Sequence, residues 1–138
     1  MENSAEFPKL LEGVKVLDFS HVQSGPTCTV MLADMGAEVV KIEPFAGDQF
    51  RGIMEGAYFF NFNRNKRAMA LNLKTKEGKE IVLKLAKNAD VLVENFLPGS
   101  MDRLGLGYGN ISQINPGIIY CSISGFGQTG PQSESGRP

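Results

Sequence analysis

Five short apolar runs recur along the chain and alternate with more polar segments. They occupy residues 14–19, 39–42, 68–73, 91–93 and 118–123, and all but 68–73 contain β-branched residues. Runs of this length and composition are typical of buried β-strands. The sequence therefore predicts five strands, separated by segments that would carry helices.

Helix signals lie between most of these runs. Residues 75–89 show the clearest one, with lysines on one face and an apolar stripe on the other. The stripe consists of Ile81, Val82, Leu83, Leu85 and Ala89. Weaker signals predict helices at 27–35, 100–104 and 111–114, whereas glycines and prolines make 43–56 a loop. Strands that alternate with helices form βαβ units, so we expect an α/β fold: a Rossmann-like parallel sheet with helices on both faces.

The composition is that of an ordinary globular domain. Of the 138 residues, 42% are hydrophobic and 21% are charged, and a net charge of −1 gives no field that would attract nucleic acid or an anionic membrane. No apolar stretch approaches the roughly 20 residues that cross a bilayer. His21 is the only histidine, and Cys28 and Cys121 lie far apart, which argues against a metal site and a disulfide scaffold. We expect a cytoplasmic protein whose residues 1–138 form one domain.

Two of the loops that follow predicted strands carry groups suited to binding an anion. Ligands gather at this end of parallel strands. Residues 20–26 lead from the first strand into a helix start, where free backbone N–H groups can meet an anion or an oxyanion, although Ser24 could simply cap the helix. Five cations between Arg64 and Lys76 suit phosphate recognition, with a solvated charged face as the alternative.

Two further loops contain turn residues next to groups that could bind a ligand. Residues 94–103 contain a Pro-Gly turn followed by Arg103, and residues 124–131 contain three glycines that permit close backbone approach. A plain turn and a flexible connector are the alternatives. The five aspartates of the chain have no neighbouring base, so we expect them to be structural or on the surface. They are Asp18, Asp34, Asp48, Asp90 and Asp102.

Six motifs occur in an order that resembles family III CoA-transferases, the CaiB–BaiF family. They are residues 11–18 (LEGVKVLD), 32–43 (LADMGAEVVKIE), 65–67 (NKR), 93–96 (VENF), 98–99 (PG) and 118–131 (IIYCSISGFGQTGP). Each motif is weak alone, but together they cover nearly the whole chain. The sequence is therefore similar to the amino-terminal portion of such an enzyme.

This resemblance implies a function and a larger assembly. Family members are longer than this chain, are Rossmann-like at their amino-terminal end, and form dimers whose two chains interlock like rings. They transfer CoA from an acyl-CoA to a carboxylic acid through aspartyl anhydride and aspartyl-CoA intermediates. Coenzyme A or acyl-CoA would then be a substrate, with no permanently bound cofactor and no metal. The expected partners are a carboxylic acid and a second copy or the missing carboxyl-terminal half, without nucleic acid or membrane.

The resemblance also implies which residues contact CoA. Gln23 would help to hold the reacting intermediate, and Lys74 and Arg103 would bind phosphate. The full expected set is His21, Val22, Gln23, Ser24, Leu71, Asn72, Leu73, Lys74, Asn95, Phe96, Leu97, Arg103, Ser124, Gly125, Phe126 and Gly127.

Departures from the family pattern concern the substrate and the nucleophile. Pro44 and Ser124 stand where formyl-CoA transferases have Arg and Lys, which favours an acid larger than formate or oxalate. The family's nucleophilic aspartate would fall just after Pro138, so we expect this chain to bind CoA but to be inactive alone. The alternatives are a 2-methylacyl-CoA racemase of the same superfamily and a non-catalytic CoA-binding subunit.

Overall fold

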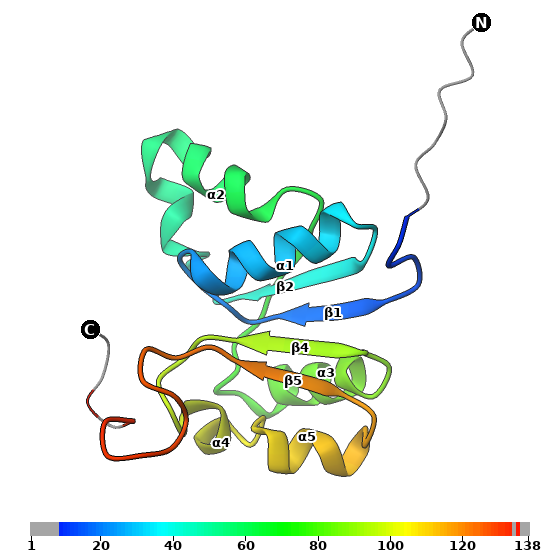
Figure 1. Cartoon of the computed structure of the whole chain (residues 1–138), viewed down its shortest axis with the longest axis vertical. Helices are drawn as coiled ribbons and strands as arrows, with labels where there is room; N and C mark the ends of the chain where they lie inside the picture. Colours follow the sequence, from blue (N-terminus) through cyan, green and yellow to red (C-terminus); the bar gives the residue numbers. More distant parts are fainter. Residues whose placement is uncertain (1–8, 134, 136–138) are drawn as a thin grey trace, which may run out of the picture.

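Five parallel strands form one sheet at the centre of the computed structural model, which describes residues 9–133 and 135. The strands are β1 (Lys15–Asp18), β2 (Glu38–Glu43), β3 (Arg67–Ala70), β4 (Val91–Glu94) and β5 (Ile119–Ser122), in the spatial order β3-β2-β1-β4-β5. Leu17 of β1 lies opposite Val40 of β2 on one side and Leu92 of β4 on the other. From β1 the chain adds β2 and β3 on one side of the sheet, and it then crosses to the other side of β1 to add β4 and β5 (Figure 1). This confirms the predicted Rossmann-like sheet.

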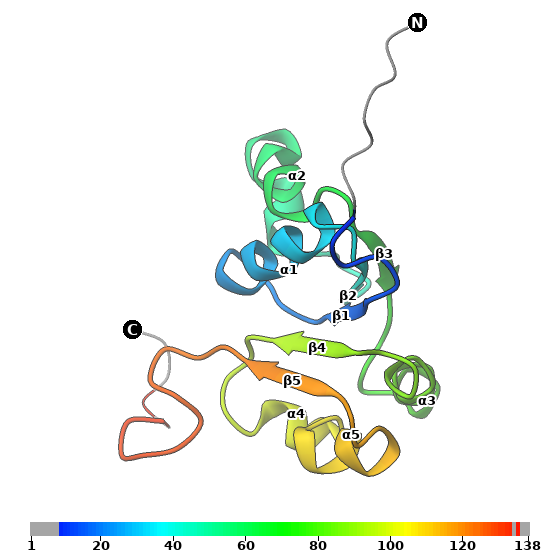
Figure 2. The same ribbon diagram turned by 45° about the vertical axis from the view of Figure 1, so that its right-hand side comes forward.

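Helices cover both faces of the sheet, as predicted. They are α1 (Ser24–Asp34), α2 (Ala57–Asn63), α3 (Lys76–Ala86), α4 (Ser100–Leu104) and α5 (Tyr108–Ile114), with two short 3₁₀ turns at Gln49–Gly52 and Met54–Gly56. α1 and α2 lie on one face, whereas α3, α4 and α5 lie on the other (Figures 1 and 2). No helix of the described residues is long and apolar enough to span a membrane.

The two faces of the sheet hold separate cores, because successive residues of a strand point to opposite sides. On the α1 face the buried cluster is small and consists of Val16, Ala33, Ala37, Val39 and Val93. On the other face it is larger and consists of Leu17, Phe19, Ile42, Val82, Ala86, Ala89, Leu92, Met101, Leu106, Ile111 and Ile118.

The buried stripe of α3 differs from the predicted one. Val82 and Ala86 are fully buried, whereas Ile81 is 37% exposed and the helix ends at Ala86. The reason lies at Gly78, where an added Cβ would be 2.1 Å from the Asn72 carbonyl oxygen. The close approach that glycine permits sets the rotation of the helix, so that the stripe runs through 78, 82 and 86.

Candidate functional site

The reversal of strand order between β1 and β4 is accompanied by a groove at the carboxyl ends of the strands. In open α/β sheets ligands bind at this switch point. The groove has a volume of about 640 Å³, within the range of small-molecule sites. It is lined by Val22, Gln23, Ser24, Thr27, Asn95, Phe96, Leu97, Pro98, Ile123, Ser124, Gly125, Phe126 and Ser133.

The loop after β1 turns sharply to direct its residues to the groove. Val22 adopts a φ of 68°, a left-handed conformation that is unfavourable for a β-branched residue. Gly25 then packs so closely on the loop that an added Cβ would lie 2.1 Å from Ser20 Cβ. A bulkier residue at Gly25 would push the start of α1 away from the strand end.

The amino terminus of α1 lies at the groove without a side-chain cap. The helix begins at Ser24 with Gln23 as the N-cap residue, and no side chain accepts a hydrogen bond from the first turn. The expectation that Ser24 caps the helix is therefore wrong. The first backbone N–H groups remain available, and they carry the positive end of the helix dipole. This arrangement favours an anion or a developing oxyanion in the groove.

Asn95 joins the loops after β1 and β4. The His21 backbone N–H donates to Asn95 Oδ1 and Asn95 Nδ2 donates to the His21 carbonyl, each at 2.8 Å. The Phe96 ring meets the His21 imidazole edge-on, with the ring centroids 5.4 Å apart. The predicted residues of these two loops are thus adjacent, and His21 lies beside the groove, next to Phe96 in its lining.

The other predicted residues divide into two groups. Ser124, Gly125 and Phe126 line the groove, whereas Gly127 is absent from its lining. The segment Leu71–Lys74 and Arg103 also lie outside the lining. Leu71 and Leu73 pack against the apolar core below the sheet, together with Phe96 and Leu104. Lys74 and Arg103 remain exposed, and the Arg103 guanidinium donates to Ser100 Oγ.

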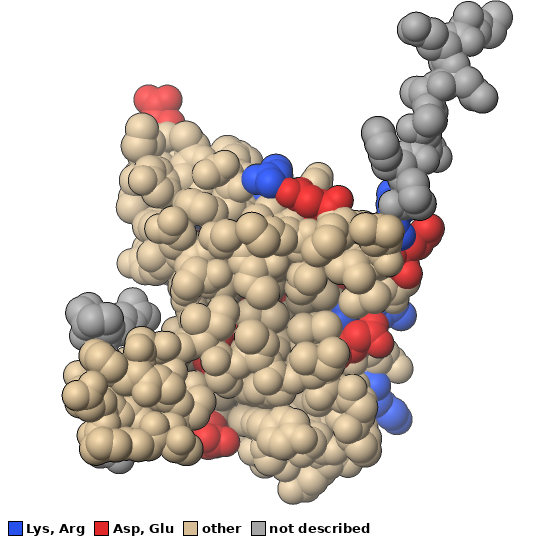
Figure 3. Space-filling view, in the orientation of Figure 1, with Lys and Arg blue, Asp and Glu red and all other residues tan. Residues whose placement is uncertain are grey.

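The predicted cluster of cations does not form a common patch. Arg64 pairs with Asp34 and Arg67 pairs with Glu38 on the surface. Lys66 is buried, with a side chain only 1% exposed. On the face of the described residues shown in Figure 3, lysines and arginines are few and scattered toward the margins. Carboxylates thus pair with Arg64, Lys66 and Arg67 of the run that the sequence suggested as a phosphate site, whereas Lys74 forms no ion pair among the described residues.

Lys66 is held inside by four acceptors from three elements. Its ammonium donates to Asp18 Oδ2 on β1 (3.0 Å), to Thr29 Oγ1 and the Pro26 carbonyl on α1, and to Asn63 Oδ1 on α2. Burial by itself would raise the pKa of Asp18, but Lys66, Lys41 and two hydroxyl donors outweigh it and hold the pKa below its ordinary value. Asp18 is therefore an ion that fixes α1 and α2 on β1.

A second buried ion pair, between Lys41 of β2 and Asp48 in the loop that follows, lies next to the first. Lys41 Nζ donates to the Ser20 carbonyl (2.6 Å) and lies 3.1 Å from Asp48 Oδ2. Asp48 Oδ2 in turn lies 3.7 Å from His21 Nδ1. Sequence reasoning treated Asp48 as structural or superficial and missed this contact with a predicted site residue. The available signal was the Gly-Asp pair shortly after a strand end.

The described residues contain no group of three or more metal-ligating side chains. Cys28 and Cys121 are free thiols, and burial raises the pKa of Cys121. The site is thus built from amide, imidazole and backbone groups.

A parallel sheet with a groove at its switch point and a free helix amino terminus defines a Rossmann-like domain suited to an anionic ligand. The chain belongs to CoA-transferase family III, whose family model matches residues 11–136.

Several relatives carry the resemblance at high identity. The chain is 48% identical over 139 residues to the succinyl-CoA:glutarate CoA-transferase of Mus musculus, which covers 96% of the chain and 32% of that protein. It is 49% identical over 132 residues to the formyl-CoA:oxalate CoA-transferase of Streptomyces avermitilis, covering 91% of the chain and 32% of the relative. The chain therefore spans about a third of the length of these relatives.

Solved structures share the fold. A CAIB/BAIF family protein from Brucella suis superposes with a TM-score of 0.87 at 41% identity, covering 91% of this chain and 36% of that one. A hypothetical protein from Mycobacterium tuberculosis gives a TM-score of 0.86 at 39% identity, with 90% and 36% covered.

Proposed function

We propose that this chain is the CoA-binding portion of a family III CoA-transferase and that its groove holds the thioester end of acyl-CoA. The observation that carries the proposal is the convergence of three loops on one groove at the strand-order reversal. Nine of the sixteen residues expected to contact CoA line it, namely Val22, Gln23, Ser24, Asn95, Phe96, Leu97, Ser124, Gly125 and Phe126.

Gln23 would face the reacting carbonyl. Its carboxamide provides both a donor and an acceptor, and it lies at the N-cap position of α1 beside the free backbone N–H groups. Donors placed where negative charge develops stabilise an acyl-transfer transition state. Gln23 and the start of α1 would therefore hold the oxyanion formed when a nucleophile adds to the thioester.

The nucleophile would come from outside this chain. No acidic residue lines the groove in the described part of the molecule, and Asp18 and Asp48 are committed to buried ion pairs. An aspartate carboxylate would add to the thioester carbonyl and expel CoA thiolate, leaving an acyl-aspartyl anhydride. The thiolate would then attack the aspartyl carbonyl of the anhydride and release the donor acid. The acceptor carboxylate would repeat both steps in reverse order.

Lys74 and Arg103 would contact the phosphates of CoA. Both side chains are exposed and neither forms an ion pair among residues 9–133. They belong to segments that pack on the same apolar core as Phe96, a groove residue. A phosphate tail leaving the groove past Phe96 would pass over this surface.

The reaction would be transfer rather than racemisation. The relatives named above are transferases, one acting with succinyl-CoA and glutarate and the other with formyl-CoA and oxalate. Pro44 and Ser124 favour an acid larger than oxalate for this protein.

The chain would act together with a second copy or with further polypeptide. Met31, Met54 and Phe60 on the α1–α2 side are 58%, 68% and 67% exposed. Exposed apolar side chains of this size mark a surface that is covered in the working assembly.

Isothermal titration of the 138-residue chain with CoA tests the proposal. We expect binding, weakened about tenfold by Lys74→Ala or Arg103→Ala because each removes a charge-assisted contact. Lys87→Ala is the matched control, since Lys87 is an exposed cation at the far end of α3 and should leave the affinity unchanged. Absence of CoA binding to the folded wild-type chain would refute the proposed site.

A further inference from the structure

The loop between β2 and α2 delivers a buried carboxylate to the neighbourhood of the groove. Asp48 follows Gly47, whose φ of 78° is a left-handed conformation that favours glycine. The Asp48 backbone N–H donates to Glu43 Oε2, and Asp48 Oδ1 accepts from the Phe50 backbone N–H, both at 2.9 Å. One carboxylate oxygen and the backbone are thus fixed, and Oδ2 is left to face the end of β1.

The loop itself is fastened to β2. The Arg51 guanidinium makes two hydrogen bonds of 2.7 Å to the Glu43 carboxylate and lies 3.7 Å above the centre of the Phe59 ring. Bidentate pairs of this kind fix direction as well as distance. The position of Asp48 is therefore set by the loop rather than by its own side-chain freedom.

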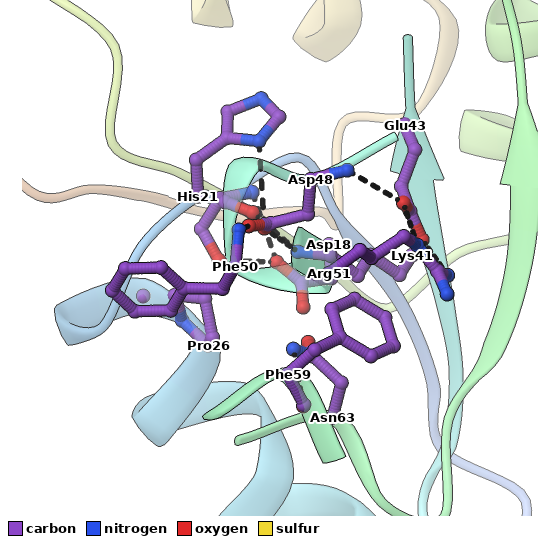
Figure 4. A network of polar contacts seen from close by, with 12 residues as sticks. Asp18, His21, Pro26, Lys41, Glu43, Asp48, Phe50, Arg51, Phe59 and Asn63 are labelled. Atoms are coloured by element: carbon purple, nitrogen blue, oxygen red, sulfur yellow. Dashed lines mark hydrogen bonds and ion pairs between the residues drawn. The ribbon is translucent and has the colours of Figure 1, made fainter. Parts of the chain in front are cut away.

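Asp48 Oδ2 lacks a hydrogen bond. It is the only buried side-chain oxygen or nitrogen without such a partner within residues 9–133 and 135, and its side chain is 1% exposed. Lys41 Nζ lies 3.1 Å away and supplies an opposite charge. Figure 4 shows the His21 imidazole with one ring nitrogen directed at this oxygen and the other directed away.

The imidazole is held on two other sides. Asn95 forms the two hydrogen bonds to the His21 backbone, and Phe96 packs against the ring edge-on. The side chain is 21% exposed, so the part of the ring that faces away from Asp48 is accessible. Phe96, which packs against the ring, also lines the groove, so the imidazole lies beside the proposed ligand site.

We propose that Asp48 is a positioning residue for His21: it keeps the proton of the neutral imidazole on Nδ1 and leaves Nε2 as a hydrogen-bond acceptor beside the groove. A carboxylate oxygen only accepts, so the nitrogen that faces it carries the proton. Nε2 then receives an amide N–H or hydroxyl of the CoA ester. This last step rests on the proposed function, whereas the tautomer does not.

The distance fits a contact that tightens on binding. The separation of 3.7 Å between Nδ1 and Oδ2 exceeds hydrogen-bond range. Such contacts are often long in ligand-free enzymes and shorten in the complex. Burial alone would raise the pKa of Asp48, but His21, the Phe50 N–H and Lys41 outweigh it and keep the pKa far below its ordinary value. Asp48 is thus an ion at neutral pH, whether it orients His21 or merely neutralises Lys41.

Nitrogen-15 NMR of the imidazole distinguishes these two roles. His21 is the only histidine in the chain, so its two ring nitrogens are assigned without ambiguity. For the neutral imidazole without ligand we expect a protonated Nδ1 and an unprotonated Nε2, with this tautomer in about tenfold excess, because the buried carboxylate attracts the Nδ1 proton even at 3.7 Å. Asp48→Asn should remove the excess, whereas Asp34→Asn, which breaks a surface pair, should leave it intact.

A wild-type spectrum with the proton on Nε2, or an Asp48→Asn spectrum unchanged from wild type, would overturn the proposal. If Asp48→Asn does not fold, the tautomer measured in the wild-type chain is sufficient to support or refute the proposal.

Titration with CoA then tests the ligand step separately. We expect Asp48→Asn to weaken CoA binding about tenfold. Unchanged affinity in a variant with the altered tautomer would refute the contact with Nε2. Failure of the wild-type chain to bind CoA would count against the proposed function and leave the tautomer result standing.

Discussion

The two faces of the sheet stabilise the protein in different ways. The face under α3, α4 and α5 buries an apolar cluster of eleven residues, whereas the face under α1 buries five apolar residues and a set of ions. The ions are Asp18, Lys41, Glu43, Asp48 and Lys66. Apolar packing tolerates small shifts, but paired ions require fixed geometry. The loop after β1, which follows the buried Asp18, enters the groove from the ionic face. The loop after β4 leads instead to α4 on the other face, and its Phe96 packs against the apolar cluster. The ionic face therefore positions the β1 part of the site.

The largest expected effect comes from removing one buried ion. Lys66→Met should lower the free energy of unfolding by about 3–5 kcal/mol, because Asp18 is left buried without its nearest cation. Urea denaturation measures the loss. Arg67→Gln is the control, since it breaks an exposed pair and should cost less than about 1 kcal/mol. Equal losses in the two variants would contradict the distinction between buried and surface pairs.

Truncation in the apolar core should separate stability from binding. Leu106 is fully buried, so Leu106→Ala should cost about 3 kcal/mol through lost apolar burial and the cavity left behind. We expect its CoA affinity, measured by titration at a temperature where the variant is folded, to equal that of wild type. A large loss of affinity would show that the apolar face also shapes the groove.

Acid should weaken the ionic face selectively. The pKa values of Asp18, Glu43 and Asp48 are depressed in the folded protein, so their stabilisation is present above the ordinary carboxyl values of 3.8 and 4.5 and is lost as the pH falls through the folded values. The free energy of unfolding should be flat near neutrality and fall below about pH 4, as these carboxylates take up protons and lose their ion pairs.

Urea titrations across this range provide the test. The pKa of Asp34 is lowered only through an exposed pair with Arg64, so Asp34→Asn should change the curve much less than the loss of a buried carboxylate does. A stability that stays constant down to pH 2 would argue against the buried ion pairs.

The smallest effect concerns the strained residue in the groove loop. Val22→Gly should stabilise the fold by up to about 1 kcal/mol, because glycine adopts a φ of 68° without steric cost. CoA affinity should fall, since the same change removes a groove side chain and loosens the loop. Loss of stability with unchanged affinity would mean that Val22 contributes packing rather than stored strain.

The sequence was sufficient for the architecture because apolar runs and turn residues report local structure. Strands, parallel pairing, two covered faces and the loops after β1, β4 and β5 followed from them. The aromatic stretch at 58–62 could not be assigned, since five residues with a single polar position, Asn61, are too few to show a helical period. It forms most of α2.

The environment of the charged residues could not be predicted in the same way. Lys66 and Lys74 belong to the same basic run, yet one is buried and the other exposed. The difference arises from contacts between Lys66 and residues 37 and 48 positions away, Thr29 and Asp18, which no local pattern records. Asp48 meets His21 for the same reason, because a loop from β2 crosses to the end of β1.

Chemical-shift mapping of the backbone amides during titration with CoA tests the central claim most directly. The account predicts that the perturbed residues cluster along the groove at 22–27, 95–98 and 123–126 and extend to Lys74 and Arg103, while the amino ends of the strands stay unchanged. Perturbations confined to the opposite end of the sheet, or none at saturating CoA, would contradict it.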